Sequence, residues 1–176
     1  MSDTEDPRAA RIERLRMNVD TWFGAHGADD RQAAMIETAF LMAAADGNIQ
    51  PAEHDQLIAT LTRVTGSRLD ARRLRIITGH LAELLATEGW IGRVAAVTRA
   101  LDSIEDRRAA FQLAAGVSYV DGEVQQEEVR LFEIFAEHFG IPLPEAEVLR
   151  DVHRSLFGSS EEVTDPVLML TKLRGD

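Results

Sequence analysis

The sequence of 176 residues contains no cysteine, so it can form neither a disulfide nor a thiolate metal site. It also lacks any run of the ~20 apolar residues that a membrane-spanning helix needs. Residues 1–6 are acidic and contain no apolar stretch, unlike a signal peptide. From these absences we expect a cytoplasmic protein with no segment inserted directly in a membrane.

Positive charge is also scarce, because 19 Lys and Arg residues face 30 Asp and Glu residues and leave a net charge of −11. This balance disfavours nucleic acid as a partner, since phosphate binding needs clustered positive charge. The charge is uneven: residues 121–147 contain eight acidic side chains and Arg130 alone, whereas residues 63–75 contain five arginines and Asp70 alone. Either segment is expected to be a solvated helix surface or to dock a protein partner.

The residue patterns of common active sites are missing. The five histidines are scattered, and no Glu-x-x-His sequence exists, which excludes the usual ferritin-like di-iron ligand set. There is no phosphate-binding glycine loop either. His54, beside Glu53, is expected to face solvent on a helix. We therefore predict a protein that is not an enzyme and binds no organic cofactor.

The spacing of apolar residues is helical throughout, and no stretch alternates like a strand. This predicts an all-α fold, a compact bundle of about seven to eight helices. Two alanine-rich helices, one ending at Ala45 and one at Val120, are apolar almost all round and should be buried. Gly89 and Gly92 should separate two helices, with Trp90 filling the corner between them. The expected organisation is a disordered acidic N-terminus (1–6), an all-α domain (7–157) and a loosely ordered tail (158–176).

One motif, Asp-Gly-x-(Ile/Val)-x-x-x-Glu, occurs twice, at residues 46–53 and 121–128. Each copy follows one of the alanine-rich helices and leads into an amphipathic segment. An apolar helix, an acidic glycine turn and a second helix form a helix–turn–helix unit. The sequence therefore predicts two related halves, at about residues 29–66 and 104–140, that arose by internal duplication.

Helix capping is one explanation of the motif. Gly47 and Gly122 would take the left-handed conformation that ends a helix. Glu53 and Glu128 would then stand at the third position of the next helix, where a carboxylate accepts hydrogen bonds from free amides and favours the helix dipole. In the first copy Gln50 would cap that helix and Pro51 would begin it. Capping alone could account for these residue types.

Metal binding is the other explanation, because an aspartate at a helix C-terminus is unfavourable with respect to the dipole. Asp46 with Glu53, and Asp121 with Glu128, could converge across each turn. Oxygen-only ligands favour Mg²⁺, Ca²⁺ or Mn²⁺. An EF-hand is excluded, since its first and third loop positions would fall on residues without a carboxylate. Those residues are Met42 and Ala44 in one copy, and Val117 and Tyr119 in the other.

The two motif copies resemble the signature of the tellurite-resistance TerB family, most closely from Arg108 to Pro142 and again from Ile36 to Thr65. The resemblance implies a bundle of seven to eight helices built from two related halves, with no catalytic reaction. It also implies a role in bacterial stress and tellurite-resistance systems, often beside membrane-associated partners. The metal ligands that it implies are Asp46, Glu53, Asp121 and Glu128. Two hypotheses follow: a stress-response module that binds a divalent cation at these turns, or a metal-free protein–protein adaptor or scaffold.

Overall fold

The computed structural model describes residues 7–23, 29–45, 47, 49–66, 69–120 and 126–157. These residues form seven helices and no strand, which confirms the predicted all-α class and helix number. The predicted N-terminal segment 1–6 and tail 158–176 lie outside them. The helices are α1 (Pro7–Phe23), α2 (Asp29–Ala43), α3 (Pro51–Thr65), α4 (Ala71–Ala100), α5 (Ile104–Val120), α6 (Gln126–Phe139) and α7 (Leu143–Phe157).

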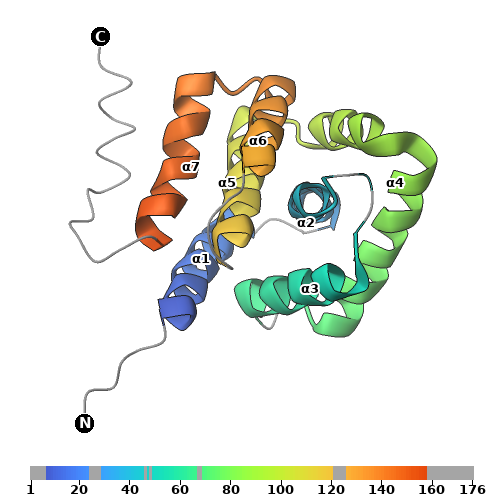
Figure 1. Ribbon diagram of the computed structural model, residues 1–176, viewed down its shortest axis with the longest axis horizontal. Helices are drawn as coiled ribbons and strands as arrows, with labels where there is room; N and C mark the ends of the chain where they lie inside the picture. Colours follow the sequence, from blue (N-terminus) through green and yellow to red (C-terminus); the bar gives the residue numbers. More distant parts are fainter. Residues whose placement is uncertain are drawn as a thin grey trace.

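Helix α2 lies at the centre of the bundle, as Figure 1 shows in a view almost along its axis. Every residue from Ala34 to Met42 is buried, whichever side of the helix it lies on. The most extensive packing of α2 is against α5, and the next is against α4. Alanines on α2 and α5, such as Ala39 and Ala110, allow the two backbones to approach closely. The two alanine-rich helices are therefore the buried pair that the sequence predicts.

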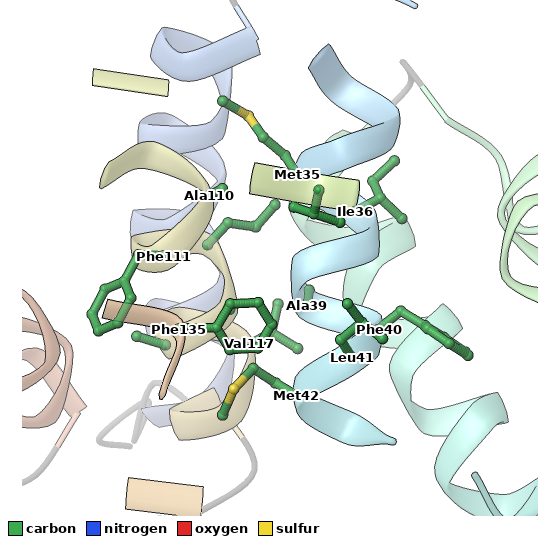
Figure 2. Packing of buried hydrophobic residues seen from close by; sticks show 14 of the residues in the cluster. Met35, Ile36, Ala39, Phe40, Leu41, Met42, Ala110, Phe111, Val117 and Phe135 are labelled. Atoms are coloured by element: carbon green, nitrogen blue, oxygen red, sulfur yellow. The ribbon is translucent and has the colours of Figure 1, made fainter. Parts of the chain in front are cut away.

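Side chains from several helices fill the space between α2 and α5. Figure 2 shows Met42 of α2, Val117 of α5 and Phe135 of α6 gathered there. Phe135 also makes an edge-to-face contact with Phe139, with ring centroids 5.4 Å apart. Such contacts add to the burial of apolar area that stabilises the core. The three phenylalanines of α6, Phe132, Phe135 and Phe139, are thus core residues.

Local sequence signals set the helix ends. Gly66, with φ of 61°, follows the last residue of α3. Asp70 is the N-cap of α4, and its carboxylate accepts a hydrogen bond from the backbone N–H of Arg73 at 2.8 Å. Ser103 precedes α5, and its hydroxyl accepts from the N–H of Asp106 at 3.0 Å. These caps satisfy amides that have no partner within the helix, so each chain segment specifies its own boundary.

Helix α4 bends around α2 (Figure 1). Its only residue with non-helical dihedral angles is Gly89, at φ 74° and ψ 164°. The predicted break is therefore at Gly89 alone, and Gly92 continues the second arm of the helix. Trp90 fixes the corner: its Nε1–H donates to the carbonyl of Leu41 at 2.8 Å, and its ring meets Phe135 edge-to-face at 5.3 Å. A left-handed glycine and an anchored tryptophan explain how one helix covers two sides of α2.

Candidate cation site

The structure describes part of each acidic turn. Gly47 has the predicted left-handed conformation, with φ of 83°, and its N–H donates to the carbonyl of Ala44 at 2.9 Å. Three predicted motif residues, Asp46, Asp121 and Gly122, lie outside the described residues. The geometry of the candidate site therefore rests on the two glutamates.

Glu53 and Glu128 occupy the same position in their helices, since each is the third residue of α3 or α6. Pro51 begins α3, as predicted. The Oε2 atom of Glu53 accepts a hydrogen bond from the backbone N–H of Gln50 at 3.0 Å, which confirms the capping role in the first copy. The side chain of Glu53 is exposed and that of Glu128 is half-buried.

The structure also supports the exclusion of an EF-hand. Met42 and Ala44 are buried at the C-terminal end of α2. Val117 and Tyr119 are buried within α5. All four side chains pack in the protein interior. At the equivalent positions an EF-hand loop has side chains whose oxygens bind calcium. Any cation at these turns must therefore be held in another way.

Glu53 and Glu128 line the same cavity, which has a volume of about 210 Å³. It is formed where α2, α3, α5 and α6 meet. Two further polar residues line it, Gln56 and Ser118, together with four residues that have alkyl side chains. The alkyl side chains are those of Ala39, Ala43, Leu57 and Val117. The fold thus brings the glutamates of the two motif copies, 75 residues apart in the chain (128 − 53), to one site.

Sequence reasoning missed Gln56 and Ser118, although a signal for each is present. Gln56 lies three residues after Glu53, and residues at this spacing share one face of a helix. Ser118 precedes the second motif copy by three residues, just as Ala43 precedes the first. Ser118 and Ala43 are also 75 residues apart (118 − 43), so the cavity takes a second pair from equivalent positions. The internal duplication itself stays a prediction.

The lining residues offer only oxygen as a metal ligand. Two carboxylates, an amide carbonyl and a hydroxyl suit a hard cation such as Mg²⁺ or Ca²⁺. Within the part of the chain that the structure describes, no three His, Asp or Glu side chains converge as a metal-binding group. The described residues therefore contain half of the predicted ligand set, and the donors fit the predicted class of ion.

A scan against protein-family models matches residues 32–151 to the model described as Tellurite resistance protein TerB. The chain belongs to the TerB family. The match extends from α2 into α7 and includes both copies of the motif. Searches of the curated proteins and of the solved structures give no match to this chain. The family resemblance stated from the motif residues is thereby confirmed.

The TerB fold turns His54 away from the cavity, which corrects the expectation that it faces solvent. The side chain is half-buried, and Nε2 lies 2.6 Å from the hydroxyl of Thr78 on α4. That hydroxyl donates to the carbonyl of Leu74 at 2.8 Å. Because successive helix residues point about 100° apart, His54 packs against α4 while the neighbouring Glu53 lines the cavity. It is a contact between helices.

A second group of charges joins α2 to α4 in this TerB structure and is called here the Arg93 cluster (Arg93, Glu37 and Glu88). Arg93 donates to both carboxylate oxygens of Glu37, at 2.7 and 2.9 Å, and to Glu88 at 2.9 Å. The side chains of Arg93 and Glu37 are only 13% and 9% exposed. The hydrogen bonds to Glu37 raise the pKa of Arg93 above its ordinary value, although burial opposes this shift. The cluster ties α4 to α2.

The predicted basic segment forms part of the surface of α3 and α4. Arg63, Arg72 and Arg73 are exposed and make no ion pair with any other described residue. Ile76 lies about one turn after Arg72 and Arg73 on α4 and is 64% exposed. Arg75 differs, because it pairs with Asp55 of α3 at 2.8 Å. Among the described helices of this TerB domain, none has the length and apolar character required to cross a bilayer.

Proposed function

We propose that this TerB domain is a non-enzymatic binding module that holds a divalent cation at the cavity between Glu53 and Glu128. The observation that carries the proposal is that equivalent glutamates of the two motif copies line one cavity. Asp46 and Asp121, which precede the glycines of the same turns, are the proposed additional ligands. Ca²⁺, Mg²⁺ and Mn²⁺ are the candidate ions, because all the donors are oxygens.

The charge of the whole chain supports this proposal. A net charge of −11 raises the local concentration of cations around the protein. The described residues that line the cavity include two acidic side chains and no basic one. Capping does not compete with ligation, since Oε2 of Glu53 accepts the backbone N–H while Oε1 can face the ion. Glu53 would then cap its helix and coordinate the ion at once.

The cellular role that we propose follows from the family. The name of the matching family model refers to tellurite resistance, which supports a stress-related role. The location that we propose is the cytoplasm. The cation would stabilise the arrangement of α3 and α6 around the cavity, so that ion concentration controls how the module presents this surface. A protein partner, in a complex that can include membrane proteins, would then recognise the surface.

Calorimetric titration of EDTA-stripped protein with Ca²⁺, Mg²⁺ and Mn²⁺ tests the proposal. We expect saturable binding of at least one ion with a Kd below about 1 mM. The Glu53→Gln/Glu128→Gln variant and the Asp46→Asn/Asp121→Asn variant should each abolish it. The matched control is Glu133→Gln/Glu137→Gln, which removes two exposed charges of α6 that do not line the cavity. If the control variant loses ion binding to the same extent, binding depends on the net charge of the protein and not on the cavity, and the proposal is wrong.

If no ion binds, a metal-free adaptor is the remaining proposal. The observation that favours it is the exposed group on α4 formed by Arg72, Arg73 and Ile76, which share one face of the helix. Exposed arginines around an apolar side chain are typical of protein-binding surfaces. In that case Arg72→Glu/Arg73→Glu should abolish partner binding, whereas Glu53→Gln/Glu128→Gln should leave it unchanged.

A further inference from the structure

The cavity between Glu53 and Glu128 is lined in part by alkyl side chains, which cannot coordinate a cation. Four of its lining residues present only alkyl groups, on α2, α3 and α5. Its volume of about 210 Å³ also far exceeds the roughly 10–15 Å³ that one water molecule needs. A metal ion gains affinity from oxygen ligands and gains nothing from methyl groups. The alkyl walls suit a ligand that carries a hydrocarbon stem as well as positive charge.

We infer that this cavity receives the side chain of an arginine from a protein partner, in competition with the divalent cation. The inference rests on the proposed function, because it assigns a partner to the same site. The guanidinium would lie between Glu53 and Glu128, and its three methylene groups would lie against Ala43, Leu57 and Val117. A long cationic side chain stays favourable when its stem is buried and its charged end is paired.

The polar lining favours arginine over other residues. A guanidinium has five N–H donors in a rigid plane, whereas the lysine ammonium has three donors and is more strongly hydrated. Glu53, Glu128, Gln56 and Ser118 offer acceptors from three different helices around the cavity. An apolar side chain would displace water from the carboxylates without supplying any hydrogen-bond donor, and an acidic one would be repelled. Arginine can do both: its guanidinium donates hydrogen bonds to the acceptors, and its methylene groups pack against the alkyl side chains.

The net charge of the chain also favours a basic partner. A chain with net charge −11 attracts a basic segment over a distance and repels an acidic one. An arginine buried in a central pocket is also the kind of residue that dominates the affinity of many protein interfaces. A cation in the cavity would occupy the same carboxylates, so partner and ion would exclude one another. Ion concentration would then regulate partner release.

The test uses N-acetyl-L-arginine methylamide as the probe and the EDTA-stripped full chain, followed by NMR. We expect saturable shifts of the methyl groups of Ala39, Ala43 and Val117 and of the side-chain amide of Gln56. The citrulline analogue has the same shape without the charge and should cause no such shifts. Whichever ion binds in the calorimetric titration should reverse the shifts caused by arginine.

Two variants separate the inference from the proposed function. Ala43→Leu fills the cavity from α2, where Ala43 is exposed, and leaves both glutamates in place. It should weaken arginine binding at least about tenfold while cation binding persists. Ser118→Leu fills the cavity from α5 and is the second variant if Ala43→Leu does not fold. Glu133→Gln/Glu137→Gln is again the control and should bind the probe normally.

The outcomes are distinguishable. Arginine binding that Ala43→Leu weakens, in a protein that binds no ion, supports the inference about the partner and overturns the proposed cation site. Ion binding without saturable shifts on addition of the arginine probe supports the proposed cation site and overturns the inference about the partner. Equal shifts with citrulline, or shifts confined to residues outside the cavity, overturn the inference.

Discussion

Two regions of this TerB domain, the Arg93 cluster and the cavity, contain carboxylates on or beside the buried helix α2. They differ in how far the carboxylates are buried and in what surrounds them. In the Arg93 cluster, Glu37 is almost fully buried and its two oxygens are bonded to one guanidinium. At the cavity, Glu53 and Glu128 line an open space, and no lining residue that the structure describes is basic. The first arrangement pairs opposite charges inside the core, whereas the second places two carboxylates on the wall of a cavity. A buried ion pair therefore marks a structural contact, whereas two carboxylates that line one open cavity mark the candidate binding site.

The Arg93 cluster should give the largest loss of stability when it is broken. Glu37→Gln removes the negative partner of a mostly buried guanidinium and should lower the free energy of unfolding by about 3 kcal/mol. The raised pKa of Arg93 means that its ion pairs stabilise the fold below the ordinary arginine pKa and are lost only as pH rises through the still higher folded value. Arg93 is thus charged at neutral pH, and urea unfolding there measures the loss.

The matched control for this variant is Glu88→Gln, because Glu88 pairs with the same guanidinium from a side chain that is 43% exposed. Exposed ion pairs contribute about 0–1 kcal/mol, so the control should change stability little. Equal losses in the two variants would contradict the view that burial of Glu37 decides the energy.

The corner of α4 should show an intermediate effect. Trp90→Phe keeps an aromatic ring near Phe135 but removes the N–H that donates to the carbonyl of Leu41. Loss of one such hydrogen bond should cost about 1 kcal/mol, which the midpoint of urea unfolding can measure. A loss above about 3 kcal/mol would indicate that the ring itself, rather than its hydrogen bond, holds the bend.

The cavity should show the smallest effect on stability. Glu53→Gln retains an oxygen that can accept from the N–H of Gln50, and glutamine is also accepted at this capping position. Only the favourable interaction of the charge with the helix dipole is lost. The free energy of unfolding of the metal-free protein should therefore change by less than about 0.5 kcal/mol. Cation affinity should fall nonetheless. A loss as large as that of Glu37→Gln would mean that the glutamate is structural, and would remove the contrast between the two regions.

Much of the fold could be predicted because it depends on local sequence. The central position of α2 follows from an apolar surface all round the helix, and the position of Gly66 after α3 follows from the conformational freedom of glycine. The caps at Asp70 and Ser103 likewise involve residues only three positions apart. The two glutamates at the third positions of their helices were predicted for the same reason.

The rest could not be predicted, because it joins residues that are distant in the chain. Nothing near Glu37 in the sequence indicates Arg93, and nothing near His54 indicates Thr78. Gln56 and Ser118 become site residues only because α3 and α5 meet at one cavity. The sequence by itself determined the helices, their ends and the family, since these depend on spacing and on turn residues. Only the packing of α2, α3, α5 and α6 decided that two glutamates 75 residues apart (128 − 53) share a site, because helix packing depends on the combined shape of all the side chains.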